Sequence, residues 1–162
     1  MDIKKEIEKL ESSDNFRRWQ KTKDAYLVHI FASDDVQALH IGYYCKKDDL
    51  ISTFVLEDNS IKQLPDSEAL KEKKSIIREL DLSKVKISFD KAREIAEKEV
   101  AEKYPREVVF KRIFILQHLD TQVWNITAIA KSFNTINLKI DALTGKVLFR
   151  DCFSLRDSVN LV

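Results

Sequence analysis

Glycine, proline and cysteine are scarce in this chain of 162 residues, which contains two of each. Phosphate-binding loops need closely spaced glycines, and long irregular loops usually contain several glycines and prolines. The scarcity therefore argues against a glycine-rich phosphate loop and favours a chain made mostly of helices and strands. Cys45 and Cys152 lie far apart in apolar runs, so we expect buried free thiols rather than a disulfide.

The sequence also lacks a charge excess and a long apolar run. Lysine and arginine number 28 against 27 aspartates and glutamates, whereas a nucleic-acid-binding module usually has a basic excess. No stretch approaches the ~18 apolar residues of a membrane-spanning helix. The first residues, Met-Asp-Ile-Lys-Lys-Glu-Ile-Glu, have no signal-peptide core. We expect no nucleic-acid partner, no membrane span and a cytoplasmic location, unless a leader segment has been removed.

Residues 1–65 are predicted to form a helix followed by antiparallel strands. Ile3, Ile7 and Leu10 recur at helical spacing among lysines and glutamates. From Asp24 onward the apolar period changes to two, which is typical of strands. Polar turns at residues 33–35, 46–49 and 58–60 separate three expected strands and a shorter fourth.

Residues 66–162 are predicted to begin with two helices. A first helix is expected to start at Pro65–Ser67, with its buried stripe at Leu70, Lys73, Ile77 and Leu80. A second helix is expected to have Ser88 as its N-cap and to end before Pro105. The small residues Ala92 and Ala96 would let this second helix lie close to a sheet.

Four strands are predicted to follow this second helix. They cover approximately Val108–His118, Gln122–Ser132, Thr135–Asp141 and Lys146–Phe153. Phe133-Asn134 is expected to form a tight hairpin, with asparagine tolerating the left-handed backbone. Gly145 is expected to supply a positive φ at the exit of the last turn.

The order of helix and strands therefore occurs twice, which predicts an α+β fold built from two related helix-plus-antiparallel-sheet halves. The stretch Val36 to Leu64 can be laid over Val123 to Phe149 with small gaps, which indicates a degenerate tandem repeat. The halves, residues 1–65 and 66–162, are two small domains or parts of one compact domain.

The second half resembles the PepSY family over roughly residues 85–150. The resemblance lies in the runs VKISFDKAREIAEKEV, VWNITAIA and IDALTGKVLF. The matching positions are Ser88, Ala92, Ala96, Trp124, Asp141, Ala142, Thr144, Gly145, Lys146 and Val147. It implies a helix packed across an antiparallel sheet, similar to cystatins. It also implies non-catalytic work, since PepSY-like domains are associated with inhibiting or regulating peptidases and with protein contacts near the cell envelope. The matched positions look structural, so no binding residue is transferred.

No pattern in the sequence indicates a catalytic or metal centre. His29, His40 and His118 lie in expected strands, and no His-x-x-x-His or Cys-x-x-Cys spacing occurs. His40 and Cys45 differ by an odd number, so a regular strand points them to opposite faces. The acidic residues lie mostly on helix faces or in turns. We therefore expect no enzyme activity, no cofactor and no metal.

Aromatic residues in the first half suggest a binding surface, although core filling also explains most of them. Tyr26, His40, Tyr44 and Phe54 are predicted to share the even-numbered face of the strands, opposite Leu39, Ile41 and Tyr43. A concave face lined with such side chains could hold a ligand or a peptide.

Three functions follow from these observations. The first hypothesis is a non-enzymatic interaction or regulatory module that binds another protein or a peptide at a sheet face or edge. The second is a small-molecule-binding or enzymatic cone-shaped fold, similar to the nuclear-transport-factor-like superfamily, suggested by the curved sheet and His40. The third is a structural homodimer joined through sheet edges. The sequence leaves monomer and homodimer open.

Overall fold

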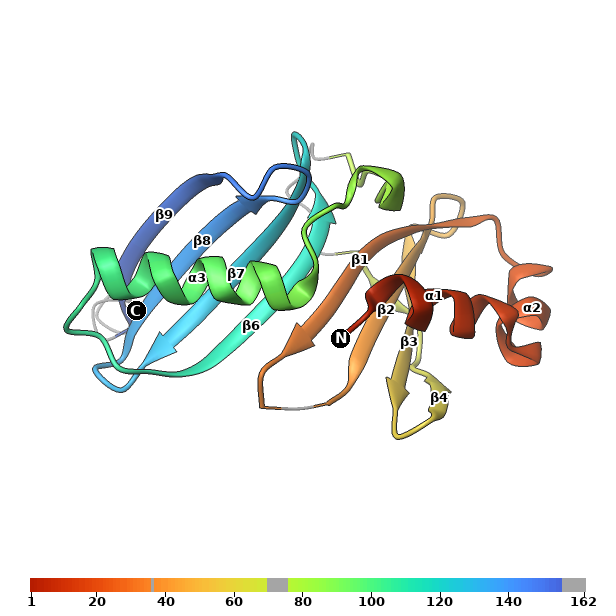
Figure 1. The fold of residues 1–162 in the computed structure, drawn as a ribbon. Coiled ribbons are helices and arrows are strands. Elements are labelled where there is room, and N and C mark those ends of the chain that lie inside the picture. Colours follow the sequence, from red (N-terminus) through yellow and green to blue (C-terminus); the bar gives the residue numbers. More distant parts are fainter. Residues whose placement is uncertain (36, 70–75, 156–162) are drawn as a thin grey trace, which may run out of the picture.

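One antiparallel sheet runs through the computed structural model, which describes residues 1–35, 37–69 and 76–155 (Figure 1). The helices are α1 (Ile3–Ser12), α2 (Asp14–Gln20), the short 3-10 helix Leu82–Lys84, and α3 (Phe89–Lys103). The strands of the first half are β1 (Ala25–Ser33), β2 (Leu39–Cys45), β3 (Leu50–Glu57), β4 (Ser60–Gln63) and β5 (Ser67–Glu68). Those of the second half are β6 (Val109–His118), β7 (Gln122–Ala130), β8 (Asn134–Asp141) and β9 (Val147–Ser154). The predicted α+β class is confirmed.

The strands lie in the order β4-β3-β2-β1-β6-β7-β8-β9, and β5 pairs with β3 beside this path. β1 and β6, the first strands of the two halves, pair from His29↔Gln117 to Ser33↔Ile113. This central pairing makes the sheet continuous across the whole molecule. In each half, helix comes first and an antiparallel run of strands follows, as expected. A common origin of the two halves and a domain boundary at residue 65 stay predictions.

Each of the α-helices α1, α2 and α3 begins at a side chain that caps its first turn. The Ser88 hydroxyl accepts a hydrogen bond from the Lys91 amide at 3.2 Å, and α3 ends at Lys103 before Pro105, both as predicted. Asp2 caps α1 and Ser13 caps α2 in the same way. Such a cap satisfies an amide that otherwise has no partner in the helix, and typically contributes about 1 kcal/mol.

The helices cover one face of the sheet, which we call the helix face. Directly paired residues in an antiparallel sheet share a face, so one row crosses the whole molecule. This row runs Phe54, Ile41, Ile30, Leu116, Trp124 and Ile140. All six side chains are buried. The core of both halves is therefore a single layer between the sheet and its helices.

Aromatic contacts fill this layer at both ends. In the first half, the rings of Phe16 and Trp19 on α2 lie 5.0–5.5 Å from those of Tyr43 and Phe54. In the second half, Phe89 lies 4.7 Å from Phe114 and 6.0 Å from Trp124. These separations are those of favourable ring pairs.

Three sequence predictions are corrected here. The prediction of a helix from Pro65 is wrong for the described residues, because Ser67–Glu68 is a strand and residues 76–80 form no helix. Residues 70–75, which were also expected in this helix, lie outside the described part of the chain. In the β7–β8 hairpin the positive φ belongs to Phe133, at 66°, and not to Asn134. Gly145 does have a positive φ, at 80°. Cys45 and Cys152 are free as predicted, but Cys152 is only half-buried.

Candidate functional site

The side of the sheet opposite the helices, which we call the open face, is not covered by any described helix or strand. Among the described residues it presents Tyr26, His29, Phe31, His40, Tyr44, Ile51, Val55, Ile113, Ile115, Ile129, Phe149 and Phe153. Most of these side chains are partly exposed, whereas the helix-face row is fully buried. Among the described residues, one side of a well-packed sheet is thus rich in apolar and aromatic side chains that no described helix or strand covers, and such a surface often marks an interaction site.

Three of the four predicted binding residues lie together on this open face. Tyr26 pairs with Tyr44, and their rings are 5.7 Å apart. His40 lies on the same face of β2 and packs edge-on against Phe31 at 5.3 Å. The tyrosine hydroxyls are held, since that of Tyr26 donates to the Ile77 carbonyl at 2.9 Å and that of Tyr44 to a carboxylate at 2.6 Å. A binding role for this set stays a prediction.

Phe54 does not belong to the set, and its predicted placement is wrong. It pairs with Ile41 and lies in the core against Phe16. Residue parity does not carry from one strand to the next: Ile41 and Phe54 are opposite each other, so odd numbers on β2 share a face with even numbers on β3.

His29 belongs to the open face and was not included in the predicted set. It pairs with Gly42, and a register shift between Leu27 and His29 places Tyr26 and His29 on the same side of β1. Burial lowers the pKa of His29 below its ordinary value of 6.5, and the charge of His40 lowers it further. The glycine inside an otherwise regular strand was the available signal, because such a glycine often marks a close approach.

The open face also continues into the second half, beyond the residues singled out from the sequence. Phe149 and Phe153 on β9 are 43% and 45% exposed. Asp151 lies between them on the same face, since these residues pair with Lys139, Asn137 and Thr135 in turn. The Lys139 ammonium lies 4.9 Å from the centre of the Phe149 ring. This surface was not predicted from the sequence, because aromatic residues in a strand more often fill a core.

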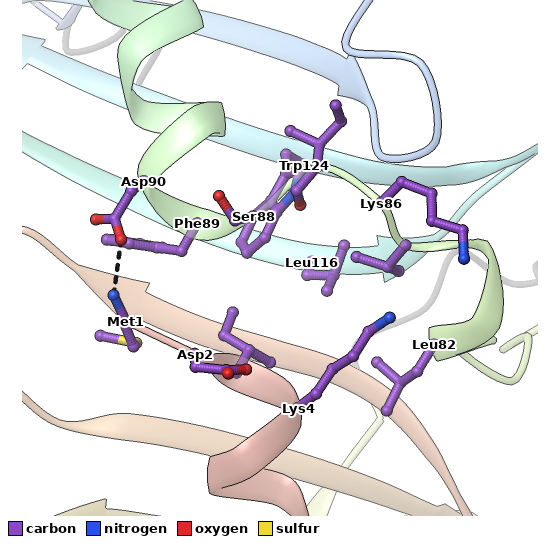
Figure 2. A pocket seen from close by; sticks show the side chains of 13 residues that line it. Met1, Asp2, Lys4, Leu82, Lys86, Ser88, Phe89, Asp90, Leu116 and Trp124 are labelled. Atoms are coloured by element: carbon purple, nitrogen blue, oxygen red, sulfur yellow. Dashed lines mark hydrogen bonds and ion pairs between the residues drawn. The ribbon is translucent and has the colours of Figure 1, made fainter.

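A cleft lies on the helix side, where the two halves meet (Figure 2). It has a volume of about 470 Å³ and is bounded by the start of α1, the segment before α3, β6 and β7. Its apolar wall consists of Ile3, Leu82, Val85, Phe89, Leu116 and Trp124. The Trp124 ring nitrogen donates to the Ile87 carbonyl at 2.9 Å, which fixes the indole in this wall.

Charged groups line the rim of the cleft. Figure 2 shows Lys4 on α1 and Lys86 on the segment before α3, at opposite sides of the cleft. The amino group of Met1 forms an ion pair with Asp90 at 2.7 Å and lowers the pKa of that carboxyl. No carboxylate of the described residues pairs with the ammonium of Lys4 or Lys86. His40 is not part of this cleft.

Neither surface carries a recognisable catalytic or metal-binding arrangement. Within residues 1–35, 37–69 and 76–155, no three histidines, cysteines or acids gather in a way that could hold a metal ion. In the same ranges, no helix is both long and apolar enough to cross a membrane. What the surfaces offer instead is apolar contact area, fixed hydroxyl groups and a few charges.

One family model matches part of the second half. Residues 86–150 match the peptidase propeptide and YPEB domain, PepSY. The PepSY segment contains α3, β6, β7, β8 and the first part of β9, so the resemblance seen in the sequence is confirmed over almost the same residues. The first half lies outside the match.

The fold has a counterpart among solved structures. A protein of Clostridium difficile 630, described as a "putative lipoprotein", aligns with 86% of this chain and 91% of its own with a TM-score of 0.55. The aligned sequences are 20% identical, so this likeness concerns the fold alone. It extends beyond the PepSY segment to most of the chain. No curated protein matches the sequence.

Proposed function

We propose that this protein is a non-enzymatic interaction module that binds a partner protein on the open face of its sheet. The PepSY match supports a propeptide-like, regulatory or protein-binding role for the second half. The observation that carries the proposal is the contrast between the two faces of one sheet. The helix face is packed to near-complete burial, whereas the open face leaves aromatic and aliphatic side chains partly exposed from β3 to β9.

The chemistry of the open face suits protein binding. Its central row runs Val55, His40, Phe31, Ile115, Asn125 and Lys139, and so has apolar side chains at its centre and polar ones beside them. Protein interfaces are enriched in aromatic residues at their centre and in polar groups around them. A tyrosine ring whose hydroxyl is already held, as in the partly exposed Tyr26, contributes area with little loss of side-chain freedom. The predicted cytoplasmic location is kept as part of this proposal.

A matched pair of variants tests the open face directly. Ile115→Lys places a charge at the centre of the open face, and Leu143→Lys places the same charge on the exposed β8–β9 turn. Proteins retained from a native lysate by the immobilised wild-type chain are identified by mass spectrometry. The proposal expects one protein to be retained by the wild type and by Leu143→Lys but lost from Ile115→Lys. Identical retention by both variants contradicts the open face as the site.

The cleft between the halves supports a second candidate, the binding of a small apolar anion. Its volume lies within the range of ordinary ligand pockets, and its apolar wall and lysine rim suit a hydrocarbon body with a carboxylate. Decanoate is a suitable probe, with the fluorescence of Trp124 as the readout. Lys86→Gln should weaken binding, whereas Lys62→Gln on the distant strand β4 should not. An unchanged spectrum up to millimolar decanoate argues against this candidate.

A further inference from the structure

The outer edge of β9 differs from the opposite edge of the sheet. β9 is a strand of eight residues without proline or glycine. At the other end the sheet closes with β4, of four residues, and β5, of two, with Pro65 between them. Proteins usually shorten or interrupt edge strands because unpaired backbone groups attract other strands. β9 is the last strand in the order of the sheet, and with its eight residues it lacks the shortening seen at the other end.

The hydrogen bonds of β9 show which backbone groups point outward. The Leu155 amide donates inward to the Phe133 carbonyl at 3.0 Å. Because amides alternate between inward and outward along an edge strand, Arg150 and Cys152 turn theirs away from β8. The Cys152 amide is accordingly bonded at 2.9 Å to the carboxylate of its own neighbour, Asp151.

The side chains at this edge define what an added strand must carry. Phe149, Asp151 and Phe153 lie on the open face at alternate positions, with the carboxylate between two half-exposed rings. Residues directly opposite each other on neighbouring strands contact one another. An added antiparallel strand therefore needs apolar side chains opposite the two phenylalanines and a cation opposite Asp151.

We propose that the outer edge of β9 binds an extended segment of another protein in which a lysine or arginine alternates with two apolar residues. The inference rests on the proposed interaction function and specifies its partner. The segment extends the sheet by one strand, and its apolar residues pack on Phe149 and Phe153. Its cation draws the Asp151 carboxylate away from the Cys152 amide, which is then free to donate to the new strand.

A second copy of this chain fits the same edge poorly. When the β9 strands of two copies pair antiparallel, opposite side chains lie on the same face of the sheet. Each residue must therefore lie opposite one whose number is odd if its own is odd, and even if its own is even. The two registers in which the strands overlap most place either Asp151 opposite Asp151 of the second copy or Arg150 opposite Arg150 of the second copy. Like charges directly opposite each other are destabilising. The charge pattern of β9 therefore favours a foreign, basic strand.

A short labelled peptide in which Val, Lys and Val alternate with Thr tests this edge by fluorescence anisotropy, beside a peptide with Glu in place of Lys. The wild type should bind the Lys peptide roughly fivefold more tightly, the ratio that corresponds to about 1 kcal/mol. Asp151→Lys should reverse the preference. Arg150→Pro removes an outward amide and should abolish binding, whereas Arg150→Ala, which keeps the amide, should bind like the wild type.

Several outcomes would overturn the inference. Equal affinity for both peptides, or full binding by a folded Arg150→Pro variant, removes it. A concentration-dependent dimer in sedimentation that Arg150→Pro abolishes identifies a second copy as the occupant instead. If Arg150→Pro does not fold, the reversal by Asp151→Lys decides alone. A further outcome is that the wild type binds neither peptide while still retaining a partner protein that Ile115→Lys loses. That result rejects the β9 edge as the site and leaves the proposed function standing.

Discussion

The imidazole of His29 occupies the space in which a side chain at position 42 would begin. Its ring atoms lie 2.3–2.8 Å from the place where Gly42 would carry a Cβ. The two residues are opposite each other on β1 and β2, and the register of β1 shifts beside them. The glycine therefore allows the ring to lie flat against the centre of the first half's open face.

Replacing Gly42 with alanine should force the His29 ring away from the sheet. We expect the free energy of unfolding to fall by about 1–3 kcal/mol, the usual range for overpacking. In a His29→Ala background the same change should cost less, because the displaced ring is gone. Urea unfolding of the four proteins in this cycle measures the coupling. Strictly additive costs would show that the ring and the methyl group do not compete.

The lowered pKa of His29 predicts a loss of stability in mild acid. Below pH ~6.5 the unfolded chain takes up a proton that the folded chain, with its buried ring, resists. The free energy of unfolding should therefore fall as the pH drops from about 7.5 through 6.5 towards the folded pKa. In His29→Gln this part of the pH dependence should disappear, as urea titrations at several pH values will show. An unchanged slope would assign the effect to other groups.

Trp124 should be the most costly single truncation in the second half. It is 1% exposed and its ring nitrogen holds the Ile87 carbonyl. Trp124→Ala should lower the free energy of unfolding by about 3–5 kcal/mol through the cavity it leaves. Trp124→Phe keeps most of the apolar volume and removes the hydrogen bond, so about 1–2 kcal/mol is expected. Thermal and urea unfolding compare both variants, and a minor loss for alanine would contradict a core role.

The two tryptophans offer a test of whether the halves unfold together. Trp19 lies in the first half and Trp124 in the second, and the sequence contains no others. The pairing of β1 with β6 predicts one cooperative transition. In urea unfolding, the fluorescence of the single-tryptophan variants Trp19→Phe and Trp124→Phe should therefore give one transition each, with the same dependence on urea concentration. The midpoints should differ only by the stability that each substitution costs, and circular dichroism should give the same curve as fluorescence for each variant. Two separate steps within one variant would instead support independent domains at residues 1–65 and 66–162.

Local patterns made most of the fold predictable. Ser88 and Pro105 mark the ends of α3, and strict alternation marks β8, because caps and strand pleats depend on neighbours in sequence. The extra helix after Pro65 was a false prediction, since its helical spacing was outweighed by pairing of Ser67 with Ile51 on β3. Phe133 adopts the left-handed backbone because the tight hairpin between two well-paired strands overrides its own preference.

The candidate site was only partly predictable, because its geometry depends on pairing between strands. Tyr26 and Tyr44 were assigned to one face correctly, because they pair directly and the register shift in β1 comes only after Leu27. Phe54 was misplaced because the turn between β2 and β3 changes the parity. The edge at β9 could not be recognised from one sequence, since nothing in an isolated strand shows whether it lies inside a sheet or at its border.

The meeting of β1 and β6 at the centre has a geometric consequence for the ends. Each half begins at the middle and proceeds outward, so β4 and β9 finish at opposite borders, separated by seven strand spacings, or about 33 Å. A segment added at β9 lengthens the molecule without touching the helix layer. Recruitment at that border can therefore be gained or lost through changes in one strand, while the folding core and the far end stay as they are.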